Sequence, residues 1–569
     1  MKSFAVLCLA APFCLYSLGA AHPSTLLAHE AALDPKEASA LSPDLHQADS
    51  PAAGARCAFS LRLVDAESGR SLPGLVRITG PDGAIIPLPG LIDRGVKLRA
   101  DDPAKGWSVL TEPGVIPLPQ KKLHLEAFSG IETELAIQDL DLTAKNAYNL
   151  TLPLHRFHFP AASGWHNGNT HLHLMNLTRR QSDEYLRTVP RGDGLELVFV
   201  SFLSRVNVDK DYITNSYTRE DVDSLSGPDL IFGHGEEYRS NFSVTKNTGY
   251  GHVMFLQIKR LILPASVGPD LTGSGPDFPP LRHAIDQARS DGATIIWCHG
   301  PWGHEEIPDW LAGRLAALNI FDNGLANSYA ETFYKYLNVG LKVPFSTGTD
   351  WFIYDFSRAY VRVDQPLTVT SWLKALEAGR TFITNGPLLE LRAGDHEIGD
   401  NVALTRPTPM PVKGRAYGRG DFQRIELVYN GRILATAASH AVGGHFEAEL
   451  DFPLDVKQSG WLALRVGNGS LDTGGSLVFP VETEPSGKRT ALNEMGEALF
   501  AHTSPIYFEV AHHPVFEPAD ARHLIEEMQA SVSAIEAKAT FATDAQRQEV
   551  LKIYQDGIEL LQRKLRMAR

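Results

Sequence analysis

The chain has 569 residues, more than one hydrophobic core ordinarily organises, so we expect about three or four domains. Its composition, with 43% hydrophobic and 21% charged residues, is typical of a soluble globular protein. The formal net charge is −14, and the sequence has no concentrated basic run. These features exclude nucleic-acid binding as the main function, because contacts with phosphates require clustered Lys and Arg.

The first residues are typical of a signal peptide. Lys2 supplies a positive charge, an apolar stretch follows from Phe4 to Leu18, and small residues up to Ala21 offer a cleavage site. An uncleaved anchor is the alternative, but the apolar stretch is short for a membrane span. We therefore expect residues 1–21 to be removed and the mature protein to be exported, periplasmic or extracellular, without a membrane span.

Residues 22–56 are rich in Ala, Pro, Ser and Asp without a sustained period, which predicts a disordered linker. Two of the four cysteines fall in the signal peptide, and Cys57 and Cys298 remain, far apart in the sequence. This spacing does not indicate a disulfide framework, although the expected compartment is oxidising. Cys298 should point away from its neighbour His299 in a strand, and we interpret it as a core residue.

Two regions have the pattern of β-sandwich domains. Residues 57–159 contain short β-rich segments separated by turns, among them CAFSLRLVD and GLVRITGPDGAIIPL. Residues 396–485 return to this pattern, with Asn430-Gly431 as a hairpin signal between two β-rich runs. We predict an N-terminal and a C-terminal β-sandwich.

Between them, residues 160–395 alternate apolar strands with helical segments. The segments NTHLHLM, LELVFVSFL, HVMFLQI, ATIIWCHG and VPFSTGTD are short and β-rich. Several lack apolar/polar alternation, as expected for strands buried on both faces of a parallel sheet. Leu281, Ile285 and Ala288 form a helical stripe that Gly292 ends. We predict an α/β fold, either a barrel or an open parallel sheet.

Residues 486–569 are expected to form a connector and C-terminal helices. The last helix has apolar residues at the spacing of a packed or paired helix, namely Leu551, Tyr554, Ile558, Leu561 and Leu565. This helix either docks on the body of the protein or mediates dimerisation, and the sequence leaves the oligomeric state open.

His171 and His173 stand two apart in a predicted strand, so both side chains point to the same face. Imidazoles about 7 Å apart on one face suit a shared divalent ion. Taken alone, however, this pair favours two hydrogen-bonded core histidines.

Further positions change that interpretation. Glu237 follows Glu236 just after a short apolar stretch, His252 opens HVMFLQI, His299 ends ATIIWCHG, and Asp350 ends VPFSTGTD. A barrel hydrolase assembles its active site from imidazoles and carboxylates at strand ends in this way. Together with the histidine pair, these residues predict a metal centre.

The spacing GNTHLH … GEE … GHVMFLQI … WCHG … STGTD, followed by TFITNGPLLEL, resembles the PHP (polymerase and histidinol phosphatase) superfamily of metallohydrolases. The branch that it most resembles contains the carbaryl-hydrolase-type enzymes. The resemblance covers residues 164–391. It implies a distorted (β/α) PHP-type barrel with metals at the strand C-termini, flanked by the two β-sandwiches and followed by the helical tail.

The resemblance also implies a ligand set. His171, His173, Glu237 and Asp350 would hold one metal, and Glu237 would bridge to a second metal held by His252 and His299. The family's third metal position has lost its ligands, because Thr178, Phe202, Leu203 and Phe352 stand where the family has Asp or His. We therefore expect one or two divalent ions, Zn or Mn.

Candidates for proton transfer or orientation near these motifs are His234, His304 and Asp322, and for each the alternative is a hydrogen-bonding or loop role. Arg205, Arg239 and Arg358 are candidates for holding an anionic substrate group, with a structural ion pair as the alternative.

The leading hypothesis for function is an exported metal-dependent hydrolase. Metal-bound hydroxide would attack an ester, carbamate, amide or phosphoester bond of a small-molecule or glycan-like substrate. One alternative is a phosphodiesterase or phosphatase of the same superfamily. The other is a non-catalytic secreted binding protein, for carbohydrate for example, with a degenerate barrel.

Overall fold

The computed structural model describes residues 45, 54–99, 101–203, 212–240, 249–263, 266–267, 275–300, 303–320, 329–466 and 491–568. These residues belong to one compact unit. The predicted signal peptide and most of the predicted linker lie outside the described residues, as do Arg205 and Asp322.

Two N-terminal sheets share one hydrophobic core. Their strands are β1 (Arg56–Asp65), β2 (Gly74–Thr79), β3 (Ile92–Asp93), β4 (Ser108–Leu110), β5 (Gly114–Pro119), β6 (Lys122–Phe128), β7 (Ala136–Asp141) and β8 (Ala147–Leu154). The sheet orders are β5-β1-β8 and β3-β4-β2-β6-β7. Every second side chain of β1 from Cys57 to Leu63 is buried, and these side chains share a core with Ile78 and Leu125 of the other sheet. The alternating pattern thus places one face of β1 in the core.

Next along the chain come the elements of the α/β region. Its strands are β9 (Trp165–Asn169), β10 (Leu172–His173), β11 (Leu197–Phe202), β12 (Ile231–Ser240), β13 (Gly251–Leu256), β14 (Ser266–Val267), β15 (Thr294–Trp297), β16 (Ala317–Asn319), β17 (Phe345–Ser346), β18 (Asp350–Trp351), β19 (Arg358–Arg362) and β20 (Thr381–Thr384). Its α-helices are α3 (Arg179–Gly192), α4 (Arg219–Asp223), α6 (Leu281–Ser290), α7 (Glu306–Leu311), α8 (Lys335–Leu337) and α9 (Val369–Glu377). The region also contains the 3₁₀ helices η1 (Pro160–Ser163) and η3 (Ile213–Ser216) and the π-helix η5 (Ala330–Tyr334).

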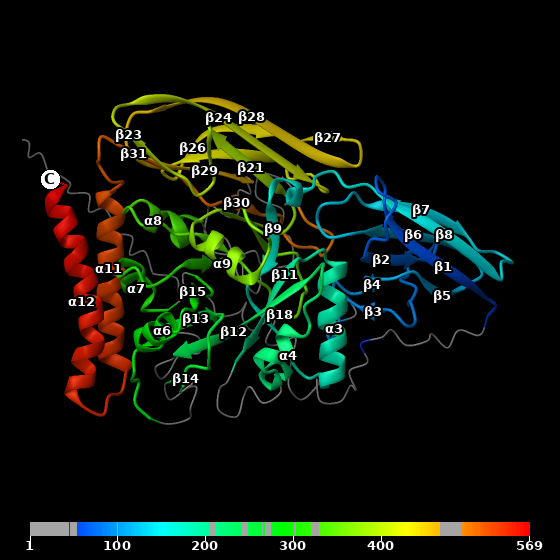
Figure 1. Cartoon of the computed structure of the whole chain (residues 1–569), viewed down its shortest axis with the longest axis horizontal. Coiled ribbons are helices and arrows are strands. Elements are labelled where there is room, and N and C mark those ends of the chain that lie inside the picture. Colours follow the sequence, from blue (N-terminus) through cyan, green and yellow to red (C-terminus); the bar gives the residue numbers. More distant parts are fainter. Residues whose placement is uncertain are drawn as a thin grey trace, which may run out of the picture. The chain divides into compact units, whose positions relative to one another are not determined.

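Local sequence explains these elements. All six residues of β11 are buried, as expected for a strand covered on both faces. Helix α3 begins after Thr178, whose side chain accepts a hydrogen bond from the backbone of Gln181 in a capping box. Helix α6 buries Leu281, Ile285 and Ala288, the predicted apolar stripe, and contacts β13 and β15 (Figure 1). The described cysteines, Cys57 and Cys298, are both buried, and Cys298 lies in the core as expected.

Within the described residues, the strands do not close into a hydrogen-bonded barrel. The order runs β17-β16-β15-β13-β12-β11-β9 and continues through β19 and β20. The next strands along the chain after β9 and β17 are β10 and β18. These two strands pair with each other in a separate parallel two-stranded sheet. Antiparallel pairing of β13 with β12 and β15 interrupts the parallel order. The fold is therefore mixed α/β, without the uniformly parallel sheet that the sequence suggested.

The large sheet continues into the C-terminal region. The remaining strands are β21 (Leu388–Ala393), β22 (His396–Glu397), β23 (Asn401–Leu404), β24 (Thr408–Gly418), β25 (Arg424–Tyr429), β26 (Arg432–Ala438), β27 (His440–Val442), β28 (His445–Val456), β29 (Gly460–Val466), β30 (Ala501–Thr503) and β31 (Ile506–Val510). Strand β20 pairs with β30, which connects it through β29 to β25 and β26. A second sheet has the order β22-β21-β24-β28-β27.

The hairpin β25–β26 turns at Asn430 and Gly431, where φ is 48° and 78°. Positive φ at both central residues is what a type I′ turn requires. The C-terminal sheets extend beyond the predicted limits 396–485, because β21 precedes them and β30 and β31 follow them. Single-sequence patterns do not show that strands on both sides of those limits join one sheet.

The chain ends in a helical hairpin, α11 (Pro518–Lys538) and α12 (Asp544–Met567), whose two helices lie side by side (Figure 1). Leu551, Tyr554 and Leu561 of α12 are buried in the same core as the α/β region. Asp277 accepts a hydrogen bond from the backbone of Thr540, 2.7 Å away, at the connection between the helices. Of the two alternatives for the last helix, docking on the body is therefore observed. None of the helices in the described ranges combines the length and the hydropathy needed to cross a bilayer.

One buried acid near this hairpin makes stability depend on pH. Burial raises the pKa of Glu306 in α7 to about 7, although Lys335 and Tyr336 oppose the shift. Because this value lies above the ordinary 4.5, the folded protein retains a proton that the unfolded chain has released, and stability falls as pH rises between the two values.

We therefore expect Glu306→Gln to reduce the loss of stability between about pH 5 and about pH 8, by up to about 3 kcal/mol. Urea unfolding of both proteins at each pH measures the difference. Parallel pH profiles for the two proteins would contradict a neutral Glu306 in the fold.

Candidate metal centre

The two predicted histidine ligands come from the segment that leaves β9 and forms β10. His171 and His173 are completely buried, and their Nε2 atoms lie 3.0 Å apart. Nδ1 of His173 is 3.1 Å from the carbonyl oxygen of Ser201. Because a carbonyl only accepts, Nδ1 is the donor, and the neutral ring presents the lone pair of Nε2 to the site.

Asp350 is brought to these histidines by strand pairing. Leu172 of β10 is the partner of Asp350 in β18, and the amides of Thr349 and Asp350 both donate to the carbonyl of His171. Oδ1 of Asp350 lies 3.3 Å from His171 Nε2 and 3.6 Å from His173 Nε2. This oxygen is buried, yet among the described residues it has no hydrogen-bond donor. A carboxylate oxygen in that situation suits a cation.

Gly348 allows the close approach of β18 to β10. A Cβ atom at this position would lie 2.7 Å from the backbone nitrogen of His171 and 2.9 Å from Oδ1 of Asn169. The Asn169 side chain accepts from the amide of His171 and donates to Thr349 Oγ1, 2.8 Å away. The glycine in STGTD is therefore required by packing against the ligand segment.

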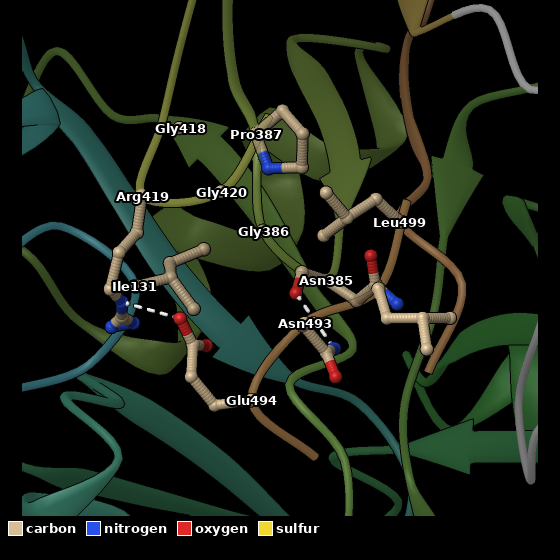
Figure 2. A pocket seen from close by; sticks show the side chains of 11 residues that line it. Ile131, Asn385, Gly386, Pro387, Gly418, Arg419, Gly420, Asn493, Glu494 and Leu499 are labelled. Carbon is tan, nitrogen blue, oxygen red and sulfur yellow. Dashed lines mark hydrogen bonds and ion pairs between the residues drawn. The ribbon is translucent and has the colours of Figure 1, made fainter. Parts of the chain in front are cut away.

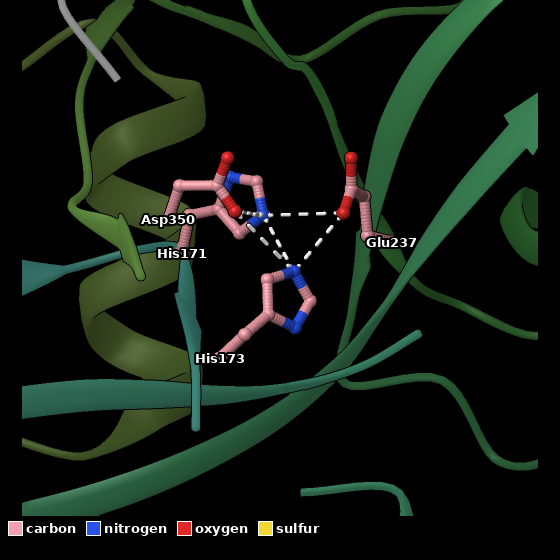
Figure 3. A group of neighbouring side chains, drawn as sticks. All are labelled: His171, His173, Glu237 and Asp350. Carbon is pink, nitrogen blue, oxygen red and sulfur yellow. Dashed lines mark hydrogen bonds and ion pairs between the residues drawn. The ribbon is translucent and has the colours of Figure 1, made fainter. Parts of the chain in front are cut away.

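Glu237 completes the first ligand group, which we define as His171, His173, Glu237 and Asp350 (Figure 3). Its Oε2 atom lies 3.0 Å from His173 Nε2 and 3.5 Å from His171 Nε2. Donors about 2.1 Å from a Zn²⁺ ion lie about 3.4 Å apart in a tetrahedron. The separations of 3.0–3.6 Å between the histidine and carboxylate atoms of this group match that spacing.

A second ligand group, Glu237, His252 and His299, lies against the first. Oε1 of Glu237 is 3.4 Å from His252 Nδ1 and 3.5 Å from His299 Nε2. Oδ2 of Asp350 is 3.8 Å from His299 Nε2. Glu237 thus presents Oε2 to the first ligand group and Oε1 to the second, and it is the residue that the two groups share, whereas Asp350 belongs to the first group alone.

The six predicted ligands are therefore brought together, although they lie in or next to five separate strands, β10, β12, β13, β15 and β18. His299 and Asp350 both have φ near 60°, at 57° and 58°. Residues other than glycine rarely adopt this left-handed conformation, and such residues concentrate at functional sites.

Electrostatics in the site favour a charged Glu237 and a neutral His252. Burial would raise the pKa of Glu237, but the positive charge of Arg239 and the contacts with the neighbouring imidazoles hold it well below its ordinary value. Burial, reinforced by Arg239, lowers the pKa of His252 to about 3. A deprotonated carboxylate and a neutral imidazole are the forms that bind metal ions.

The predicted arginines have different surroundings. Arg239 forms a bidentate ion pair with Glu237, with Nε 2.8 Å from Oε1 and Nη2 2.7 Å from Oε2. Arg358 instead donates to the carbonyl oxygens of Phe356 and Asp193 and supports the backbone. Arg205 lies outside the described residues.

The histidines predicted for proton transfer belong to neither ligand group. In β12, His234 lies on the face opposite to Glu237 because side chains alternate, and its Nε2 is 2.8 Å from the carbonyl of Ile258. Glu236 shares that face and accepts from the amide of Ile262. His304 is 2.9 Å from Ser531 Oγ of α11. These contacts are those of the hydrogen-bonding alternative for both histidines, and Asp322 lies outside the described residues.

The positions compared with third-metal ligands in the sequence resemblance have structural roles here. Thr178 caps α3, and Phe202 and Leu203 are buried in or next to β11. Phe352 is fully buried and its ring contacts Tyr185, with centroids 5.4 Å apart.

Sequence reasoning did not find Tyr212 and Trp351, whose rings lie 5.8 and 5.4 Å from that of His173. Trp351 follows the Asp of STGTD directly, and this adjacency was an available signal.

A separate, small pocket is lined by none of the predicted ligands (Figure 2). It is lined in part by Asn385, Arg419, Asn493 and Glu494. Arg419 forms an ion pair with Glu494, and Asn493 donates to the backbone of Asn385. These polar groups bond to one another and give no sign of a ligand.

No model of a protein family matches the chain, and no curated protein matches it. Among solved structures, the chain is similar to two of the β-glucuronidase of Parabacteroides merdae, one with glycerol in its active site. Identity is 9% and 8%, the TM-score is 0.16 in both cases, and 77% and 78% of this chain is covered. The chain covers 60% of each β-glucuronidase. A likeness this distant indicates neither a shared fold nor a shared activity.

We expect His171→Ala or Asp350→Ala to abolish metal binding, because each removes a donor from the first ligand group. Elemental analysis of the purified variants should show less than about a tenth of an ion per chain, since loss of even an indirect partner weakens binding 10- to 100-fold. His155→Ala, at an exposed position in the link to the α/β region, is the control and should keep its metal. Full metal content in either ligand variant would remove that residue from the site.

A second prediction concerns the backbone that supports the ligands. Gly348→Ala forces β18 away from His171, so we expect metal affinity to fall by about tenfold or more. Gly227→Ala is the matched control, because a Cβ atom there has nothing within 4 Å. Calorimetric titration with Zn²⁺ compares the three proteins. Unchanged affinity in Gly348→Ala would mean that the contact does not position Asp350.

Proposed function

We propose that this protein is an exported metal-dependent hydrolase of the PHP type. The observation that carries the proposal is a buried pair of ligand groups that share Glu237. Their imidazole and carboxylate donors suit Zn²⁺ or Mn²⁺. A divalent ion held there would supply Lewis-acid activation of water and of the bond under attack.

The position of the site within the fold supports this proposal. His171 follows β9, His299 follows β15, and Asp350 follows β17, so these ligands lie at the carboxyl ends of strands. Active sites of (β/α) barrels are assembled at that end. In the part of the chain that the structure describes, the strands from β17 to β9 do not close on themselves, and the pairing of β10 with β18 connects the segment after β9 to the segment after β17. A distorted barrel, closed through that short pair, is the interpretation that we propose for this region.

The residues around the centre would orient the ligands, compensate their charge and leave one side open to water. Ser201 orients His173 through its carbonyl, and Arg239 compensates the charge of Glu237. The side chains of His252 and His299 are 11% and 7% exposed, whereas those of the first ligand group are 0–2% exposed. Water and substrate would therefore reach the centre from the side of His252 and His299.

The class of substrate follows from the resemblance and not from the geometry. We propose an ester, carbamate, amide or phosphoester bond in a small-molecule or glycan-like substrate. A phosphodiesterase or phosphatase falls within this range.

One observation favours a second candidate function. Thr178, Phe202, Leu203 and Phe352 leave no ligand at the family's third metal position, and their side chains are committed to capping and packing. A secreted binding protein that retains a structural metal would have such a site. Turnover distinguishes it from the enzyme.

We expect the metal-loaded protein to hydrolyse generic aryl esters or phosphodiesters, and a chelator to abolish this turnover. Zn²⁺ or Mn²⁺ added back after the chelator should restore it. His171→Ala should be inactive before and after metal addition. A metal-loaded protein inert toward both kinds of substrate would favour the binding protein, and turnover insensitive to the chelator would place catalysis elsewhere.

A further inference from the structure

Arg239 has an unusual position for a residue beside a metal centre. It lies two residues after Glu237 on the same face of β12, and its side chain is 6% exposed. Its guanidinium contacts both oxygens of Glu237, at 2.8 and 2.7 Å. In the sheet, Arg239 is also the direct partner of His252 in β13. A fixed positive charge therefore lies next to the second ligand group.

The ion pair limits what Glu237 can offer to metals. A carboxylate has about four lone-pair directions, and a bidentate arginine uses one on each oxygen. Oε2 then retains one direction for the first ligand group, and Oε1 retains one for the second. Because Arg239 occupies one side of the carboxylate, Glu237 cannot bind one ion with both oxygens from that side. Its negative charge is also shared between Arg239 and any ion that it binds.

The fixed charges of the site also favour one bound ion over two. With neutral histidines, the two carboxylates and the guanidinium leave one net negative charge on the two ligand groups together. One divalent ion converts this to one net positive charge. A second ion, about 3.5–4 Å from the first, would add two more in a buried site where repulsion is poorly screened.

The first ligand group is also the better donor set. It has two histidines and two carboxylates, Asp350 and Glu237, whereas the second ligand group has two histidines and Glu237 as its only carboxylate. Arg239 contacts both oxygens of Glu237, so only the first ligand group keeps a carboxylate, Asp350, that is not paired with Arg239. We propose that Arg239 makes this centre selective for a single divalent ion in the first ligand group. His252 and His299 then remain metal-free and line the solvent side of that ion. This inference rests on the proposed metal centre and adds to it the number of ions and the residue that sets the number.

The test is the metal stoichiometry of four proteins, measured by calorimetric titration with Zn²⁺ and by elemental analysis after dialysis. They are the wild type, Arg239→Met, Arg239→Gln and Arg239→Lys. We expect one tightly bound ion in the wild type and in Arg239→Lys, which keeps the charge. Arg239→Met and Arg239→Gln should bind two, with the second site tightened by at least about tenfold because the repelling charge is gone.

A double variant locates the additional ion. Arg239→Met combined with His252→Ala should return to one ion, since the second ligand group then lacks a donor. Circular dichroism verifies folding, and the two neutral variants are independent, so that one folded variant suffices.

Each other outcome has a definite meaning. Two ions of similar affinity in the wild type would overturn the inference, and so would one ion in the folded neutral variants. In both cases the proposed metal centre survives. No bound ion in any of the proteins would overturn the metal centre itself, and the selectivity of Arg239 with it.

Discussion

A carboxylate that is removed from water must be compensated by positive charge or hydrogen bonds, and Glu237 is such a group. It is completely buried, and both of its oxygens are surrounded by nitrogen atoms of imidazoles and of Arg239. Leaving it unpaired would cost several kcal/mol, of the order of about 3–5. The surrounding strands are therefore constrained to deliver those nitrogens, and the arrangement of β10, β12, β13 and β15 follows from this requirement.

The same constraint explains where the backbone is least regular. Strands β10 and β18 have two residues each, yet their pairing holds His171 and His173 beside Asp350. His299, Asp350 and Phe352 all have positive φ at the ends of their strands. Such conformations cost about 1–3 kcal/mol each and persist only where the surroundings impose them. Here the hydrogen bonds from Asp350 and Phe352 to the histidine segment hold these two residues in that conformation.

The sequence indicated the ligand residues better than the sheet that carries them. His171, His173, Glu237 and Asp350 were found because alternation and strand ends are local properties, readable from a few residues. The antiparallel insertion of β13 and the separation of β10 from β9 depend on pairing between distant segments, which no local pattern encodes. The position of His304 also depends on a distant segment. It lies a few residues after His299 in the chain, but its ring contacts Ser531 of helix α11. Arg239 was considered as an anion-binding residue, and only its contact with Glu237 reveals its role in the site.

The pairing of β20 with β30 affects how the chain can mature. Residues 501–503 complete the sheet that includes β9 and β19, although they are among the last strand residues to be synthesised. Until they arrive, β20 is an edge with unsatisfied backbone groups, which invites association with other chains. A polypeptide synthesised from its N-terminus thus contains both candidate ligand groups before the strand that pairs with β20 exists. Chaperone protection during that interval would keep the unpaired edge of β20 from aggregating.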